Sequence, residues 1–366
     1  MAINKYHRIA GIMLTAVFLL SSCLPDGDYK TEVNYEPRDT GDGWKIASAS
    51  DQGFDQGKLR AVYDIMFDED RFITSRSLLI ARNGYLVSES YLRSKEDIAH
   101  KENIMGVTKS ITSLLAGITW DQGGIRTGQM IYNHIPYYFD GDRNKRDMTI
   151  DHALTMRIGL QWDQKGHTVD MFNIDRFPSS MRVVLTKPFV YEAGTEFYYN
   201  HGAPQLIMGI MQKAFGLSET DSLVHLLFDP LGIDDFVWEQ HADGLHFGGL
   251  GLHIKPRDLA RIGQFILQRG WWDGVQVVSN EWLRMATTQK VSPEMTGSSA
   301  YGYYWWVDDE NKAFYGKGEG GQYLYIVPDR NLVIVHTANP SVGNGYKGIE
   351  HEDFISLAGM IMDALD

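Results

Sequence analysis

The chain has 366 residues, of which 43% are hydrophobic and 22% are charged, and its formal net charge at pH 7 is −13. This composition provides enough apolar mass for one large domain or two closely packed subdomains, and it excludes a disordered chain. The acidic chain also lacks the clustered Lys and Arg that bind phosphate backbones, which excludes nucleic acid as a partner.

The N-terminus has the features of an export signal. A short basic start precedes an apolar run over residues 9–20, which is too short for a comfortable membrane span. Small residues then lead to Cys23, the single cysteine of the chain, in a pattern that resembles a bacterial lipoprotein cleavage box. We expect residues 1–22 to be a lipoprotein signal peptide and Cys23 to carry the lipid; an ordinary secretory signal or a membrane anchor is the alternative.

The segment after the cysteine indicates how the folded part of the chain is attached to the membrane. Residues 23–45 are rich in Asp, Gly and Pro before the first strand pattern, which predicts a flexible tether. The acidic body is repelled by anionic lipid headgroups, so we expect the lipid alone to hold it to the membrane. The expected location is therefore a bacterial membrane, facing the periplasm or the cell surface. A lone cysteine also excludes an intramolecular disulfide in the body.

The body, residues 46–366, begins and ends with strand patterns. Two apolar runs flank Asn83-Gly84, which predicts a β-hairpin. Helical spacing begins at residue 107 and ends before Gly123-Gly124. Further helical patterns lie at about 203–215, 256–269 and 280–287. Strand patterns return over 301–307, 322–327 and 332–337, before a final helical pattern at about 351–365.

This order of elements predicts the fold class. Strands at both ends with helices between them favour an α+β fold, in which helices flank an antiparallel sheet and a mainly helical subdomain is inserted. We expect the α/β part to comprise about 46–105 and 245–366, and the helical part about 106–244.

The first candidate site lies at the start of the helix near residue 106. Gly106 and Lys109 are one turn apart on the same helix face. Acyl transfer by a hydroxyl needs a base within hydrogen-bond reach, and a helix N-terminus provides N–H groups beside the developing oxyanion. Ser-x-x-Lys meets both needs; here the lysine is present and the hydroxyl is absent. By itself, Gly-x-x-Lys predicts no function.

Two later segments contain other groups that acyl transfer uses. Residues 194–202 include Tyr198, Tyr199 and Asn200, and a phenol there exchanges protons if a neighbouring lysine stabilises its phenolate. Packing tyrosines at the rim of a core are the alternative. Residues 316–322 are rich in glycine, which lets a ligand approach a strand entrance and frees an N–H group for an oxyanion. A hairpin turn explains the same residues in isolation.

The three segments, in this order and spacing, resemble the serine β-lactamase and penicillin-binding-protein superfamily over about residues 46–366. The branch they resemble contains class C β-lactamases, family VIII-type esterases and 6-aminohexanoate-dimer hydrolases. The resemblance also rests on residues 154–160, 230–233, 247–252, 256–258 and 301–306. It implies a β-lactamase/transpeptidase-like fold, ester or amide hydrolysis through an acyl-enzyme, a small-molecule ester, amide or peptide as substrate, and no cofactor.

The resemblance assigns roles to the first two segments. Gly106 occupies the place of the nucleophilic serine, and Lys109 that of the general-base lysine. Tyr199 is the expected motif tyrosine because it follows Gly194 at the family's spacing. Tyr198 remains its rival, since Tyr198-Tyr199-Asn200 is a literal Tyr-x-Asn sequence.

The resemblance also assigns the third segment. Glu319-Gly320-Gly321 corresponds to the third family motif, in which relatives begin with Lys or His. The N–H groups of Gly106 and of Gly321 or Gln322 would line the oxyanion hole.

The chain departs from the family pattern at Gly106, Ile158, Ala193 and Glu319. The change at residue 106 has the largest consequence, because losing a covalent nucleophile removes the acyl-enzyme route. Thr108 points to another side of the helix and Ser110 lies a turn deeper, so neither is expected to replace it.

Other candidate sites have less support. Asp140-x-Asp142-x-Asn144 begins like a calcium loop, but Lys145 stands where such loops require Gly, so we expect no metal. The histidines form no His-Glu-x-x-His pair, which disfavours a zinc hydrolase. We expect His201 to pack at a helix start, with a place in the pocket as the alternative.

Three functions remain open at this point. The first is a covalent ester or amide hydrolase, which requires a serine at position 106 of the natural protein. The second is a pseudoenzyme, a surface-tethered protein that keeps the pocket without turnover. The third is a non-covalent hydrolase in which Lys109 and Tyr199 activate a water. The sequence favours the loss of covalent chemistry.

Overall fold

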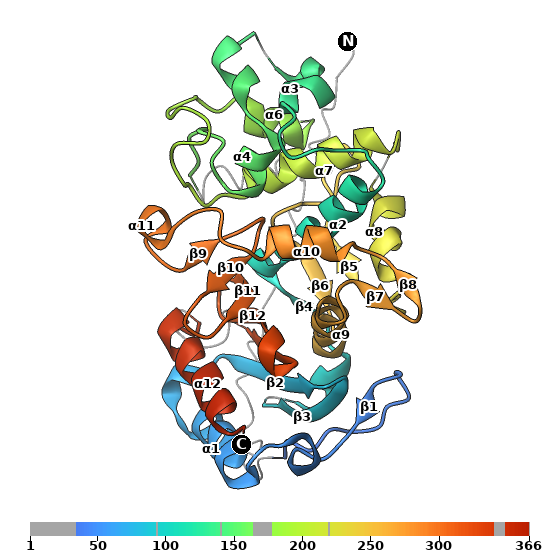
Figure 1. The fold of residues 1–366 in the computed structure, drawn as a ribbon, viewed down its shortest axis with the longest axis vertical. Coiled ribbons are helices and arrows are strands. Elements are labelled where there is room, and N and C mark those ends of the chain that lie inside the picture. The colour runs from blue at the N-terminus through green and yellow to red at the C-terminus, as the bar shows by residue number, and fades with distance from the viewer. Residues whose placement is uncertain are drawn as a thin grey trace, which may run out of the picture.

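A computed structural model describes residues 34–92, 94–139, 141–163, 178–218, 220–339 and 348–365. The predicted signal peptide and Cys23 lie outside these residues. Within them, one large sheet carries helices on both faces, and a mainly helical region lies beside it (Figure 1). No helix in the described ranges is long and apolar enough to cross a lipid bilayer.

The large sheet joins strands from both ends of the body. Its eight strands have the order β1-β3-β2-β13-β12-β11-β10-β9. They are β1 (Lys45–Ile46), β2 (Ser75–Arg82), β3 (Tyr85–Tyr91), β9 (Ala300–Tyr301), β10 (Trp306–Asp308), β11 (Ala313–Gly318), β12 (Gln322–Val327) and β13 (Leu332–Ala338). Neighbours are antiparallel except β1 and β3, which are parallel. The prediction of an α+β fold with an antiparallel sheet is therefore confirmed.

Both faces of this sheet are covered, which explains why its central strands read as continuous apolar runs. In β2, Leu78 and Ile80 pack with α1 (Gln56–Asp68) and α12 (His351–Asp363), whereas Leu79 and Ala81 pack with α2 (Thr108–Asp121) and α9 (Pro256–Leu267). Successive side chains of a strand point to opposite faces, so two covered faces need apolar residues at every position.

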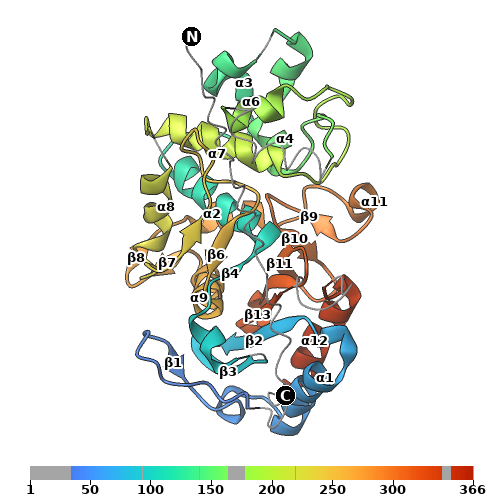
Figure 2. The ribbon, with the colours of Figure 1, turned by 180° about the vertical axis from the view of Figure 1, so that it is seen from behind.

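The helical region forms the other end of the molecule (Figures 1 and 2). It contains α3 (Ile131–His134), α4 (Ile150–Leu154), α6 (Ser180–Leu185), α7 (Gly202–Ala214) and α8 (Asp221–Phe228). Helix α2 packs against α7, α8 and α10 (Asn280–Ala286). Between this region and the large sheet lies a small sheet of β4 (Glu102–Asn103), β5 (Val237–Trp238) and β6 (Leu252–Ile254). Helix α2 therefore connects the helical region to the sheet.

Of three further short elements, two pair with each other beside α9 and the third contacts β9. They are β7 (Trp271–Trp272), β8 (Val275–Gln276) and α11 (Pro293–Thr296). The predicted strand over residues 301–307 is wrong, because the structure has a turn between β9 and β10, in which Tyr304 adopts a φ of +64°. Aromatic residues on both sides of Gly302 give this segment the composition of a strand, which hides the reversal.

The chain before β1 lies against the body, which differs from the prediction of a free tether up to residue 45. Tyr35 stacks on Tyr63 with ring centroids 4.9 Å apart. The Arg257 guanidinium donates to the carboxylates of Glu89 at 2.6 Å and Asp42 at 2.9 Å. Because this buried arginine binds both the sheet and the incoming segment, it ties residues 35–44 to the body.

Candidate active site

Position 106 lies in a short 3₁₀ turn, Met105–Val107, directly before α2. Gly106 is buried, and a Cβ atom at this position would be 2.5 Å from the carbonyl oxygen of Lys317 and 3.0 Å from the hydroxyl of Tyr199. The preceding Met105 has a φ of +48°, an uncommon conformation for a residue with a side chain. The backbone at the nucleophile position is therefore strained, and it leaves no room for a side chain without a shift.

Strand β11 approaches this turn backbone to backbone. A Cβ atom at Gly318 would be 2.4 Å from the carbonyl oxygen of Ile104, and one at Gly316 would be 2.9 Å from Ser110 Oγ. Glycine permits such close contact because it has no Cβ. Gly316 and Gly318 of β11 and Gly106 thus allow the strand to pack closely against the start of α2.

Lys109 follows one turn later on α2, and its side chain is buried. Its Nζ atom donates to the carbonyl oxygen of Gly249 at 3.0 Å and lies 2.9 Å from Nδ1 of His201. It also lies 4.5 Å from the centroid of the Tyr199 ring. Burial lowers the pKa of Lys109 to about 7, because desolvation penalises the ammonium form. Near neutral pH this amine is able to accept a proton.

The structure places Tyr199, and not Tyr198, beside position 106. The Tyr199 ring packs against the rings of Tyr301 and Trp306, with centroid distances of 6.2 Å and 5.7 Å. Burial raises the pKa of its hydroxyl, so the phenol is neutral at physiological pH. Tyr198 is 44% exposed. Of the two candidate tyrosines, only Tyr199 has its hydroxyl where a residue at position 106 would contact it.

Asn200 was expected among the substrate-binding residues, but its side chain is used within its own loop. Its Nδ2 donates to the Tyr198 carbonyl at 2.6 Å, and its Oδ1 accepts from the Ala203 N–H at 2.7 Å. The side chain is 1% exposed. Asn200 therefore fixes the loop that carries Tyr199 into α7.

The predicted third motif forms the turn between β11 and β12. Glu319 is exposed, and Gly320 and Gly321 have φ values of +88° and +108°. The Gly321 N–H donates to the Gly318 carbonyl at 3.3 Å, so it is engaged within the turn. The residues that contact position 106 are Lys317 and Gly318, which directly precede this motif.

The side chain of Gln322 and the ring of His336 connect this turn to neighbouring strands of the large sheet. Gln322 binds both backbone polar groups of Ala338, through Nε2 at 2.5 Å and Oε1 at 3.1 Å. His336 Nδ1 lies 2.6 Å from the Gly321 carbonyl, and Nε2 lies 3.0 Å from Ser75 Oγ. Burial lowers the pKa of His336 to about 4, so a neutral ring donates through one nitrogen. These contacts fix the turn in place, and they use the side-chain amide of Gln322 to bind β13.

His201 was expected to pack at a helix start, and the structure also places it in the site. A Cβ atom at Gly249 would be 2.9 Å from His201 Nδ1, so this glycine lets the imidazole reach Lys109. Burial, together with the nearby Lys109, holds the pKa of His201 well below its usual value. In the sequence, only the position of His201 directly after Tyr199-Asn200 indicated a place in the site.

The calcium-like segment is not organised as a metal site in the residues that can be described. Asp142 accepts from the Asn144 N–H at 3.1 Å, as a cap of a 3₁₀ turn. Asp140 lies outside the described residues. Within the described ranges, no group of three or more His, Cys, Asp or Glu side chains is placed to hold a metal ion.

The chain is similar to known proteins over most of its length. Residues 73–352 match the model of the family described as Beta-lactamase. The chain is 25% identical over 286 residues to the 6-aminohexanoate-dimer hydrolase of Paenarthrobacter ureafaciens, which covers 71% of each protein.

Solved structures share the fold at lower identity. A Bacillus anthracis protein provisionally named as a 6-aminohexanoate-dimer hydrolase superposes with a TM-score of 0.70 at 18% identity, over 91% of this chain and 90% of the other. A penicillin-binding-protein homologue from Caulobacter crescentus gives 0.67 at 15% identity, over 84% and 97%.

Proposed function

The chain belongs to the beta-lactamase family, as its motifs predict, and on this premise we propose that it is a pseudoenzyme within a family of serine hydrolases. It keeps the pocket of the family and binds a small ester, amide or peptide there without forming an acyl-enzyme. We further propose that it is exported and held to a bacterial membrane through lipid on Cys23.

The observation that carries this proposal is the contact at position 106. The residue has no hydroxyl, and the Lys317 carbonyl oxygen lies 2.5 Å from the place of a Cβ atom. Side-chain carbon atoms do not approach backbone oxygens this closely. The family's covalent route begins with a serine oxygen at this position, so loss of the side chain removes its first step.

The groups that remain favour binding. The Lys109 amine, with a pKa of about 7, and the neutral Tyr199 phenol both face the start of α2. Both are able to donate hydrogen bonds to a carbonyl oxygen of a ligand. The ring of Trp306, which stacks on Tyr199 and is partly exposed, provides an apolar wall for such a ligand.

The decisive experiment is a search for a covalent adduct. We expect intact-protein mass spectrometry to find no added mass after incubation with a fluorophosphonate or with a β-lactam such as ampicillin. A family enzyme that retains the serine is the positive control for each reagent. An adduct on the unmodified chain would refute the pseudoenzyme proposal, whatever residue carried it.

One observation favours a second candidate, a hydrolase without a covalent intermediate. The lowered pKa of Lys109 makes its amine a candidate general base for water. This function predicts turnover of p-nitrophenyl esters without an adduct, and loss of that turnover in Lys109→Met. Absence of turnover in the wild-type chain would leave binding as the function.

The proposed anchor has its own test. Cells grown with an alkyne fatty acid should yield labelled wild-type protein in the membrane fraction. The matched variant Cys23→Ser should be unlabelled, and the chain has no other cysteine to receive lipid. Label on Cys23→Ser, or none on the wild type, would contradict lipidation at this residue.

A further inference from the structure

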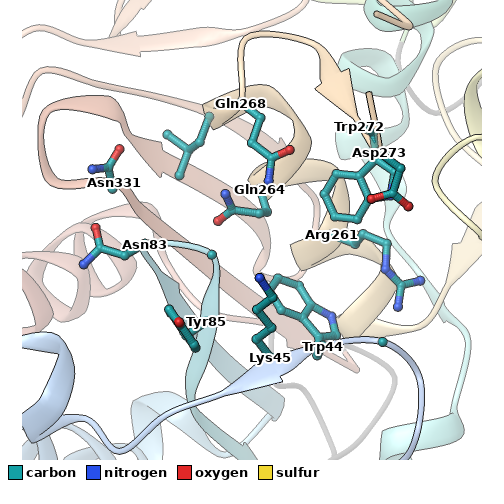
Figure 3. Close-up of a pocket in the computed structure, with 13 residues that line it drawn as sticks. Trp44, Lys45, Asn83, Tyr85, Arg261, Gln264, Gln268, Trp272, Asp273 and Asn331 are labelled. Carbon is teal, nitrogen blue, oxygen red and sulfur yellow. The ribbon is translucent and has the colours of Figure 1, made fainter. Parts of the chain in front are cut away.

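A cavity of about 570 Å³ lies at the β1 edge of the large sheet, away from the candidate active site. It is bounded by β1, the β2–β3 turn, the C-terminal half of α9, the β7–β8 turn and the turn after β12 (Figure 3). Its lining residues are Gly43, Trp44, Lys45, Asn83, Gly84, Tyr85, Arg261, Gln264, Leu267, Gln268, Trp272, Asp273 and Asn331. Its volume is within the range of about 300–1,000 Å³ that is typical of small-ligand sites.

The sheet separates this cavity from position 106. Tyr85 comes from β3, whereas Gly106 contacts β11. Strands β2, β13 and β12 lie between β3 and β11 in the sheet order. A ligand in this cavity therefore occupies a second site, and its binding does not depend on the proposed function of the first.

The lining combines aromatic rings with side-chain amides. Trp44, Tyr85 and Trp272 line the cavity together with Gln264, whose side chain extends from α9 (Figure 3). Asn83, Gln268 and Asn331 supply further amides. Each amide offers both a donor and an acceptor, as a sugar hydroxyl does, and the C–H faces of a sugar ring pack on aromatic rings.

The Gln264 amide lacks a hydrogen bond at its oxygen. Gln264 is 7% exposed, and among the described residues its buried Oε1 atom has no partner. A buried polar atom without a partner is costly, and native proteins leave few of them. A donor from a bound ligand, such as a hydroxyl, would satisfy this acceptor.

The charges around the cavity favour a neutral ligand over an anion. The Arg261 guanidinium is already engaged, by Asp258 at 2.7 Å and by the Asp42 carbonyl at 2.6 Å. Lys45 is exposed, and the same cavity is also lined by the negatively charged Asp273. No cluster of free cations is therefore available for a phosphate or a carboxylate.

The turns that bound the cavity are fixed in place. The Asn83 N–H donates to the Asn331 carbonyl at 3.0 Å, which joins the β2–β3 turn to the turn after β12. On the other side, the Trp44 indole N–H donates to the Arg257 carbonyl at 3.2 Å. A site on fixed elements loses little conformational entropy when a ligand binds.

We propose that the cavity between α9 and the β1 edge binds a short neutral carbohydrate, stacked on Trp44, Tyr85 or Trp272 and hydrogen-bonded to the Gln264 amide. In this arrangement a sugar hydroxyl donates to Gln264 Oε1, and the neighbouring amides bind adjacent hydroxyls. The chain then has a glycan site at one edge of its sheet and the family pocket at the other.

The test is isothermal titration calorimetry of the full folded chain with maltotriose, cellotriose, mannotriose and triacetylchitotriose, and with trigalacturonate as an anionic probe. We expect at least one neutral trisaccharide to bind saturably. Trp272→Ala should weaken that binding about tenfold or more, because an aromatic stacking surface is removed. Trp271→Ala is the matched control, since Trp271 is the exposed neighbour on β7 and does not line the cavity.

The variant Gln264→Met distinguishes an effect on ligand affinity from an effect on the stability of the fold. It keeps the length of the side chain and removes the unpartnered oxygen, so the melting temperature should stay the same or rise while affinity falls about tenfold. Tyr199→Phe, at the other site, should leave the affinity unchanged. The proposal is overturned if no neutral sugar binds, if only trigalacturonate binds, if both cavity variants bind normally, or if Tyr199→Phe loses the binding.

Discussion

The carbonyl oxygen of Lys317 lies 2.5 Å from the position that a Cβ atom of residue 106 would occupy. Strand β11 thus takes part of the space that a side chain at residue 106 would need. The Tyr199 hydroxyl is a second neighbour, 3.0 Å from the same position. The glycine at position 106 allows β11 to pack this closely, and the close packing in turn disfavours any side chain at position 106.

Gly106→Ala should destabilise the protein by about 1–3 kcal/mol, because one added methyl group overpacks the contact with β11. Urea denaturation followed by circular dichroism measures this change. Gly359→Ala in α12 is the matched control, since its Cβ has no neighbour within 4 Å. That control should instead gain about 0.5–1 kcal/mol from its higher helix propensity. Equal effects of the two substitutions would contradict the close packing at residue 106.

Gly106→Ser should acquire fluorophosphonate labelling at residue 106, because Lys109 and Tyr199 remain beside the new hydroxyl. Labelling should fall below pH 7, since the pKa of Lys109 is about 7 and its ammonium form is unable to accept a proton. Gly106→Ala is the control without a hydroxyl. A folded Gly106→Ser protein that stays unlabelled would mean that β11 blocks the reaction and that the framework has lost more than its serine.

Lys109 should make the stability of the protein rise with pH in the alkaline range. Its pKa is lowered by burial to about 7 in the folded state, from 10.5. Between these values the unfolded chain binds the proton and the folded chain does not, so unfolding free energy increases by about 1.4 kcal/mol per pH unit. Below pH 7 both states are protonated, so the dependence on pH disappears and the full cost of burying the ammonium group remains. Subtracting the pH profile of Lys109→Met isolates the effect, and parallel profiles would disprove it.

Glu89→Gln should cost about 3–5 kcal/mol, because it leaves the buried Arg257 guanidinium without its main partner. It should also release residues 35–44 to limited proteolysis, since Arg257 binds the Arg38 carbonyl and the Asp42 carboxylate. Asp329→Asn is the comparison, because its pair with Lys312 is 3.6 Å long and exposed. A surface pair of this kind contributes about 0–1 kcal/mol.

The pattern of apolar residues predicted the fold class because the helices show helical spacing and the strands show as short apolar runs. Helix α9 was expected over 256–269 and is observed over Pro256–Leu267. The hairpin at Asn83-Gly84 has its turn at those two residues. Such patterns record which face of an element is buried, so they locate elements without revealing contacts between distant parts of the chain.

The contacts of the site depended on information that local patterns lack. Spacing alone left Tyr198 and Tyr199 as rivals. It also did not reveal that Lys317 and Gly318, directly before the predicted third motif, contact position 106. The packing of His201 against Lys109 needs Gly249, which is 48 residues away from His201 in the chain. The Arg257–Glu89 pair spans 168 residues. Tertiary contacts of this length leave no periodic trace in the sequence.

Strand β13 lies between β2 and β12, so the hydroxyls of Ser77 and Thr337 meet at 2.7 Å across 260 residues of chain. A ribosome must therefore synthesise the polypeptide as far as β13 before the central sheet is able to close. Until then β2 offers an unpaired apolar edge, which is prone to aggregation and slow to find its partner. We expect C-terminal truncations before residue 332 to collapse or be degraded, and biosynthesis of the protein to depend on holding chaperones.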